Sequence, residues 1–292
     1  MILENFDFEN YQGEDLIFAV GAPGSKWSGL LNALTFHKNI NDDDKADHRQ
    51  YFIYYKQAET GQVLRMGWHF GVYFGPGNEH GENFDDMSKL SKEEIVREFA
   101  KPYESWDGVK IIKSHWFAYN LDVIEKYFPK AKIILVWAPD ESCFDWWTHL
   151  GGWNITFPVY TWYANDERMK TQIKEENAWI LKFIFEKNLK IIKGGIKEVC
   201  TLLDFNTDAE SFKEFDPADL SKNISKVTDN NTDLSPLGSL NQLIGHTLYT
   251  VYDPAKQSGP HPVLSLIDNV FAKRTIHSVE SLIPLGDKYD GV

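Results

Sequence analysis

Residues 15–34 read DLIFAVGAPGSKWSGLLNAL and contain an apolar run, a turn of small residues and a helix-like segment, in that order. The apolar run predicts a buried strand that ends at Val20, and the helix is expected over Trp27–Thr35. A strand, a tight loop and a helix in this order present backbone N–H groups and the positive end of a helix to an anion. The stretch therefore predicts an α/β fold with an anion-binding loop. An ordinary turn, which needs glycine and proline for geometry alone, is the alternative.

The loop carries groups that suit a phosphate or a sulfate, because Lys26 supplies a cation and Ser25 and Ser28 supply hydroxyls. The nucleotide-binding motif G-x-x-x-x-G-K-[ST] requires glycine before the lysine and Ser or Thr after it. Here Ser25 precedes Lys26 and Trp27 follows it, so the loop does not have the ATPase or GTPase form. The residues expected to bind the anion are Gly21, Ala22, Pro23, Gly24, Ser25, Lys26, Trp27 and Ser28.

Composition limits the class of protein. The chain has 292 residues, 42% of them hydrophobic and 25% charged, and one domain over residues 1–292 is the simplest organisation. Its formal net charge of −13 argues against nucleic acids and acidic membrane surfaces as partners, because these require a basic surface. Cys143 and Cys200 are the only cysteines, which excludes a disulfide framework. The sequence has no signal peptide pattern and no apolar run near the ~20 residues of a membrane span, so a cytoplasmic protein is expected.

Short apolar runs alternate with helical segments along most of the chain. Residues 49–75 contain two β-rich runs around a Gly-containing turn, which predicts an inserted β-hairpin. Residues 110–115 and Lys132–Trp137 are typical of buried parallel strands. The order predicts a mainly parallel sheet covered by helices. Helices are expected at 88–100, 120–128, 166–187, 236–244 and 264–272, a strand at 189–193, and a polar, loop-rich segment at 206–259.

Candidate chemistry gathers at three predicted strand ends, residues 21–28, 113–115 and 137–145. Ligands of open α/β sheets bind at the carboxyl ends of the strands. Strand alternation predicts that Lys113 and His115 share a face, where they suit a charge stabiliser and a general base. The alternative is that His115 caps the strand and Lys113 extends to solvent.

The assembled pattern resembles the sulfotransferase family, which transfers a sulfuryl group from the nucleotide donor 3′-phosphoadenosine 5′-phosphosulfate (PAPS) to a hydroxyl or amine. The family loop P-[KR]-S-G-T-T is matched at Pro23, Ser25 and Ser28, with the basic residue two places later at Lys26. The family motif K-[ST]-H is matched at residues 113–115, Lys-Ser-His. The resemblance covers about residues 15–147 and implies a P-loop-like nucleotide-binding fold.

The resemblance also implies roles for individual residues. His115 is the expected base, Lys113 stabilises charge on the bridging oxygen, and Lys26 helps the loop to hold the phosphosulfate. In the family, an arginine and a serine hold the 3′-phosphate of the donor. This chain has Trp137 or Ala138 at the place of the arginine, and Asp145 falls at the place of the serine. A carboxylate at Asp145 repels a phosphate, so weak selection for that phosphate is expected.

Aromatic residues over 144–163 predict the acceptor side, and Trp153 and Trp147 are the expected contacts; packing in the core is the alternative. The expected acceptor is a small molecule or glycan with a hydroxyl, and a homodimer is a further expectation. No metal is expected, because a sulfuryl group carries less charge than a phosphoryl group. Two other functions stay open: a non-catalytic binder of a phosphorylated ligand, and a small-molecule kinase with Asp140 and Glu141 as metal ligands.

Overall fold

The computed structural model of the chain describes residues 2–35, 37–44, 50–56, 63–69, 72–75, 80–149, 165–189, 192–193, 196–212 and 248–256. Its centre is a five-stranded sheet with the strand order β4-β1-β5-β7-β6. β1 pairs in parallel with β4 and β5, whereas β7 runs antiparallel to β5 and β6, so four strands point in one direction. The bounds are β1 Leu16–Gly21, β4 Lys110–Lys113, β5 Lys132–Trp137, β6 Ile192–Lys193 and β7 Leu248–Tyr252.

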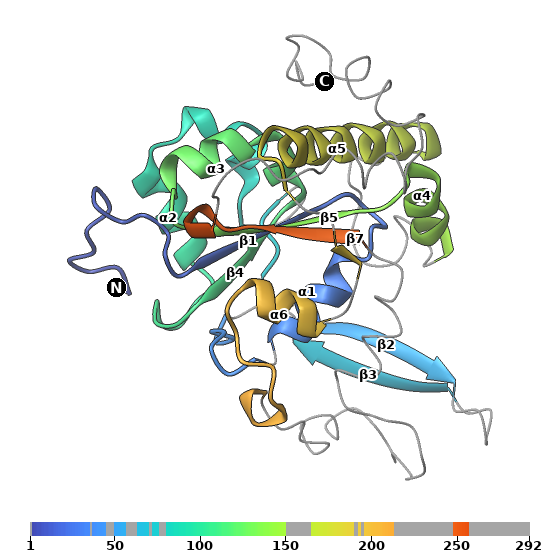
Figure 1. The fold of residues 1–292 in the computed structure, drawn as a ribbon, viewed down its shortest axis with the longest axis horizontal. Coiled ribbons are helices and arrows are strands. Elements are labelled where there is room, and N and C mark those ends of the chain that lie inside the picture. The colour runs from blue at the N-terminus through green and yellow to red at the C-terminus, as the bar shows by residue number, and fades with distance from the viewer. Residues whose placement is uncertain are drawn as a thin grey trace.

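Helices cover both faces of this sheet (Figure 1). On one face, apolar side chains of α2, α3 and α5 pack with Phe18, and on the other face α1 and α6 pack with Ile17 and Ala19. Successive side chains of a strand point to opposite faces, so β1 must be apolar at every position. The expected α/β fold is confirmed. The bounds are α1 Trp27–Thr35, α2 Lys92–Ala100, α3 Leu121–Tyr127, α4 Asp140–His149, α5 Asp166–Glu186 and α6 Ile196–Leu202.

Local signals place the helix starts. The helix expected over Trp27–Thr35 forms with those bounds. α2 begins after Ser91, whose hydroxyl accepts from the Glu94 backbone N–H while the Glu94 carboxylate accepts from the Ser91 N–H at 2.7 Å. This reciprocal capping box satisfies two backbone donors that the helix itself leaves unpaired. α5 begins after Asn165, whose side chain accepts from the backbone of Arg168.

The strand expected over residues 110–115 ends at Lys113. The Ser114 hydroxyl accepts a hydrogen bond from the Trp116 backbone N–H at 3.0 Å, and this bond starts a 3₁₀ helix, η2, over His115–Tyr119. A serine that bonds to the backbone two residues ahead competes with the strand pattern. The alternation that predicts one face for Lys113 and His115 therefore does not extend to the histidine.

β7 is the main departure from the predicted fold. It lies inside the segment that the sequence marks as loop-rich, and it pairs antiparallel with β5 from Leu248 opposite Trp137 to Tyr252 opposite Ile133. Its β-branched and aromatic residues favour a strand, but the run is short and stands alone among polar residues, and its pairing depends on an edge made more than a hundred residues earlier. Of the strand expected at 189–193, the structure describes β6 at Ile192–Lys193, and residues 190–191 lie outside the described residues, as do the helices expected at 236–244 and 264–272.

Two further strands, β2 (Gln50–Lys56) and β3 (Val63–His69), pair antiparallel in a separate two-stranded sheet (Figure 1). Residues 57–62, which connect them, lie outside the described residues, so the turn of the expected hairpin stays a prediction. Across the described ranges, no helix combines the length and the apolar character that crossing a membrane requires.

Candidate functional site

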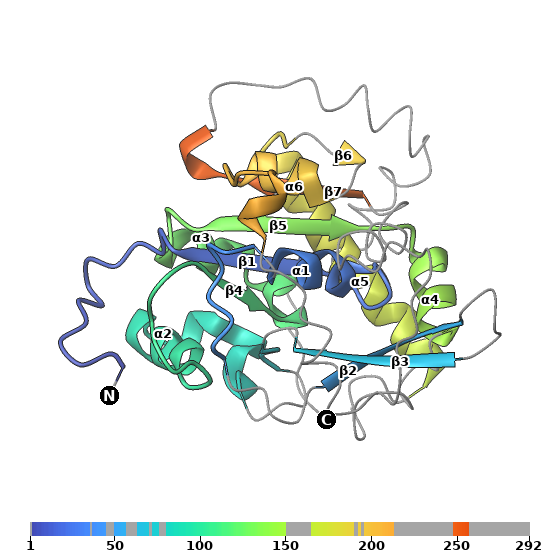
Figure 2. The same ribbon diagram turned by 90° about the horizontal axis from the view of Figure 1, so that it is seen from below.

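The three strand ends that the sequence singles out lie at one edge of the sheet. β1 lies between β4 and β5, with Ala19 opposite Lys113 of β4 and Gly21 opposite Val136 of β5. The loop after β1, the start of η2 and the start of α4 therefore follow neighbouring parallel strands. Figure 2 shows α4 beyond the end of β5. This is the edge at which ligands of open α/β sheets bind.

The loop between β1 and α1 is tightly curled. Gly24 and Lys26 both have left-handed backbones, with φ of 77° and 66°. A Cβ on Gly24 would lie 1.9 Å from the carbonyl oxygen of Cys143 in α4, and one on Gly21 would lie 2.8 Å from Cβ of Trp27. Both glycines are therefore required. A left-handed conformation at a lysine costs roughly 1–2 kcal/mol, so the surrounding packing must enforce it.

Ser25 is fully buried within this loop, and its Oγ has no hydrogen-bond partner among the described residues. Its backbone N–H donates to the Ala22 carbonyl at 3.0 Å and closes the turn. The Oγ lies 2.9 Å from the point where a Cβ on Gly21 would stand, so the hydroxyl faces the inside of the curl. An unpartnered buried hydroxyl costs about 1–3 kcal/mol, which the oxygen of a bound anion can offset.

Lys26 extends toward α4, where its Nζ lies 4.2 Å from the centre of the Trp146 ring. Trp27, the first residue of α1, is buried and directs its ring toward His115, with 4.9 Å between the ring centres. Ser28 is the second residue of α1. The loop thus has its cation on the α4 side and an aromatic ring on the η2 side.

His115 is held in a buried cluster. Its Nδ1 lies 2.9 Å from Oε2 of Glu176, a side chain of α5 that is fully buried. The Tyr73 ring lies 5.6 Å from the imidazole. Burial raises the pKa of Glu176, and the neighbouring His115 opposes that shift. Histidine and a buried carboxylate in contact at a ligand-binding edge are the arrangement that general-base chemistry uses.

Lys113 is buried, with 4% of its surface exposed. The alternative in which it extends to solvent is therefore wrong. The cap at this strand end is Ser114, whose hydroxyl accepts from Trp116 and also lies 3.3 Å from the Gly75 carbonyl oxygen. Ser114 thus has a local structural role, whereas Lys113 and His115 on either side of it are buried at the end of β4.

Glu176 is the functional candidate that the sequence reading missed. It lies three residues after Ile173 and four before Ile180, both of which are buried. That spacing places the carboxylate on the apolar face of the helix. An acidic residue on the apolar face of a predicted helix could have identified Glu176 from the sequence, because an acidic side chain is almost never fully buried without a partner.

α4 contributes two aromatic residues near the loop, Trp146 and Trp147. Trp147 packs against a small cluster that contains Ala22 and Cys143. Asp145 is exposed on α4. Trp137, which stands where the resemblance expects an arginine, is buried with 3% of its surface exposed. Trp153 lies outside the described residues.

Asp140, a ligand in the kinase alternative, is held by the protein itself. The Asn177 side-chain amide donates to Oδ1 of Asp140 at 2.7 Å and to the Ala138 carbonyl at 2.9 Å. Burial raises the pKa of Asp140. In the part of the chain that the structure describes, no three His, Cys, Asp or Glu side chains gather in an arrangement that could hold a metal ion.

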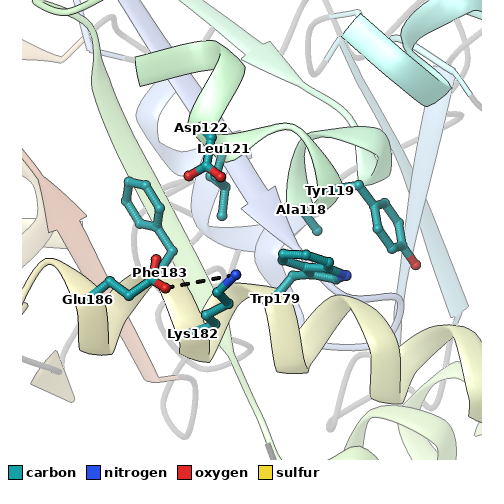
Figure 3. A pocket seen from close by; sticks show the side chains of 8 residues that line it. All are labelled: Ala118, Tyr119, Leu121, Asp122, Trp179, Lys182, Phe183 and Glu186. Carbon is teal, nitrogen blue, oxygen red and sulfur yellow. Dashed lines mark ion pairs between the residues drawn. The ribbon is translucent and has the colours of Figure 1, made fainter. Parts of the chain in front are cut away.

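A small hollow lies between η2, α3 and α5 (Figure 3). Trp179 lies below Ala118, and Lys182 pairs with Glu186 at 3.8 Å along one wall. No residue of the loop after β1 lines it.

Comparison of the chain with family profiles, curated proteins and solved structures finds no match. The geometry at the carboxyl edge of the sheet therefore carries the evidence for a function.

Proposed function

We propose that the protein is a sulfotransferase, which moves a sulfuryl group from PAPS to an acceptor hydroxyl at the carboxyl edge of the sheet. One observation carries the proposal: the His115–Glu176 pair lies directly against the first residue of the helix that follows the curled loop. A base and an anion cradle must be neighbours for in-line transfer, because catalysis of this kind consists mostly of positioning and charge stabilisation.

The loop fits the phosphosulfate end of the donor. Counted from Gly21, the frame of the nucleotide-binding loop places Lys26 at its second glycine, Trp27 at its lysine and Ser28 at its Ser or Thr. The left-handed φ of Lys26 is the backbone that favours glycine, which supports this frame. Ser25 Oγ and the N–H groups at the start of α1 would hold the anion.

In this proposal the donor supplies the sulfuryl group and the chain supplies positioning and proton transfer. His115 accepts the proton of the acceptor hydroxyl through Nε2, because Nδ1 is bound to Glu176. Lys113, buried at the end of β4, stabilises the negative charge that develops on the oxygen between phosphorus and sulfur. Lys26 moves from the Trp146 ring to the phosphosulfate. A cation–π contact is worth about 0.5–1 kcal/mol and a charged hydrogen bond about 1.5–3, so the move is favourable.

The 3′-phosphate of the donor has a weaker fit. Trp137 is a core side chain and Asp145 is an exposed carboxylate, so neither residue supplies a cation. This observation favours one second candidate, a non-catalytic protein that binds a phosphorylated ligand. The kinase alternative is less favoured, because the Asp140 carboxylate is already bound by Asn177.

Titration calorimetry with 3′-phosphoadenosine 5′-phosphate, with and without Mg²⁺, tests the proposal. Saturable binding that does not depend on Mg²⁺ is the expected result. Binding that requires Mg²⁺ would favour the kinase. No binding in either buffer would contradict the proposed sulfotransferase.

A further inference from the structure

Helix α5 directs two fully buried polar side chains toward η2. Gln172 and Glu176 are four residues apart, so they lie one above the other on the same face of the helix. The Gln172 amide nitrogen donates to Oε1 of Glu176 at 2.8 Å and to the Tyr119 hydroxyl at 2.5 Å. His115 and Tyr119 are the first and last residues of η2, so the cluster joins both ends of this 3₁₀ helix to α5.

Both oxygens of the Glu176 carboxylate are engaged, Oε2 by His115 and Oε1 by Gln172. A buried carboxylate is costly, and a leucine would fill the same apolar stripe without that cost. The orientation of both oxygens therefore indicates a role that depends on the carboxylate itself.

We propose that Glu176, held in place by Gln172, is the positioning residue that keeps the proton of His115 on Nδ1 and so makes Nε2 the nitrogen that accepts a proton. The inference rests on the proposed function for its purpose, but not for its geometry. A neutral imidazole carries one proton, and a carboxylate 2.9 Å from Nδ1 accepts a hydrogen bond only when that proton is on Nδ1.

The rest of the cluster limits rotation of the imidazole. The ring of Trp27 lies 4.9 Å from it at an interplanar angle of 58°, and the ring of Tyr73 lies 5.6 Å away at 67°. The carboxylate therefore selects the tautomer of a ring whose orientation is already restricted. Because Trp27 begins α1, the imidazole is oriented relative to the loop that would hold the donor.

The test is the tautomer of His115, read from the ¹⁵N chemical shifts of the labelled full-length protein at about pH 8.5, above the ordinary histidine pKa. The expected result is a proton on Nδ1 in the unmodified protein. A proton on Nε2 would overturn the proposal, whatever the variants do.

Three variants separate positioning from simple packing. Glu176→Leu removes the acceptor, and Glu176→Asp keeps the charge but withdraws the oxygens; both should shift the tautomer toward Nε2–H. Asn177→Ala is the matched control, because this neighbouring buried residue bonds to Ala138 and Asp140 instead of His115. A tautomer that stays unchanged in Glu176→Leu would overturn the proposal.

The readout on activity is separate from the readout on structure. Glu176→Leu should lower turnover by ~10²–10⁴-fold, with the dissociation constant for 3′-phosphoadenosine 5′-phosphate within about twofold of the original. If the unmodified protein binds no nucleotide, the proposed function is refuted, and the tautomer result still stands. An Nε2–H tautomer with normal nucleotide binding would refute the positioning role alone.

Discussion

Each edge of the parallel sheet holds an acid–base pair with a fully buried member, Lys110 at one edge and Glu176 at the other, and the two pairs differ in what surrounds them. At the amino edge, Lys110 is fully buried, pairs with Asp15, donates to the Trp106 carbonyl at 2.7 Å and lies 4.5 Å from the centre of the Trp106 ring. Asp15 also accepts from the Tyr11 hydroxyl. At the carboxyl edge, His115 pairs with Glu176 beside a strained loop.

The difference lies in which polar atoms stay unpartnered among the described residues: at the amino edge this is the indole nitrogen of Trp106. Burial lowers the pKa of Lys110 even though Asp15 opposes that shift, yet the ammonium group has partners on several sides. At the carboxyl edge, Ser25 Oγ and Gln172 Oε1 have no partner among the described residues. A buried ion pair alone is therefore weak evidence for a functional site. Unpartnered groups beside a loop with left-handed residues are better evidence.

Substitution of the base at the carboxyl edge should have the strongest effect, and that effect should be on turnover. His115→Asn should lower turnover by ~10²–10⁴-fold and leave nucleotide binding nearly intact, because it removes the base and not the anion cradle. Phenols, alcohols and glycans are the acceptors to assay. His37→Asn is the control, since that buried histidine bonds to the Asn206 carbonyl, away from this edge. Turnover that survives His115→Asn would show that the Lys-Ser-His motif is structural.

Substitutions at the amino edge should instead lower the stability of the fold. Lys110→Ala removes a fully buried ammonium group from its pair with the partly exposed Asp15 and should lower the free energy of unfolding by about 1.5–3 kcal/mol, the size of a hydrogen bond between charged groups. Urea denaturation measures this change. Lys89→Ala, which removes an exposed pair with Asp86, should cost no more than ~1 kcal/mol. Equal costs for the two variants would contradict the structural role of the Lys110 pair.

A third substitution tests the loop. Lys26→Ala should weaken nucleotide binding by ~1.5–3 kcal/mol, the size of a charged hydrogen bond, with little change in stability. Lys38→Ala removes the same charge from an exposed position outside the loop and is the control. A dissociation constant that stays the same in Lys26→Ala would leave Lys26 on the Trp146 ring and outside the site.

The smallest expected effect concerns the donor. Adenosine 5′-phosphosulfate, which lacks the 3′-phosphate, should bind within about tenfold of PAPS, a difference under ~1.4 kcal/mol. The reason is that Trp137 and Asp145 give that phosphate no cation. Competition between the two nucleotides measures the difference. A hundredfold preference for PAPS would indicate a cationic site elsewhere, for which Lys273 and Arg274 are the candidates.

The parts of the fold that the sequence predicted carry local signals. The apolar run of β1, the helix over Trp27–Thr35 and the Ser91–Glu94 capping box each depend on neighbours within a few residues. The residues of β7, Leu-Tyr-Thr-Val-Tyr, favour a strand, but its antiparallel pairing with the distant β5 depends on the folded structure and could not be read from them.

The same limit applies to the site. The sequence predicted that the loop, Lys113 and His115 meet at one edge, because parallel strands end together. It did not predict that Lys26 would face Trp146, since that contact depends on how α4 packs against Gly24. Glu176 comes from a helix more than sixty residues beyond His115, and only the folded structure brings them into contact.

Backbone amide shifts during titration with 3′-phosphoadenosine 5′-phosphate compare the two edges of the sheet in one experiment. If nucleotide binds at the carboxyl edge, Gly24, Ser25 and Trp27 should show saturable shifts, and Asp15 and Lys110 should show none. Shifts confined to the amino edge, or a loop that does not respond at millimolar nucleotide, would contradict binding at the carboxyl edge.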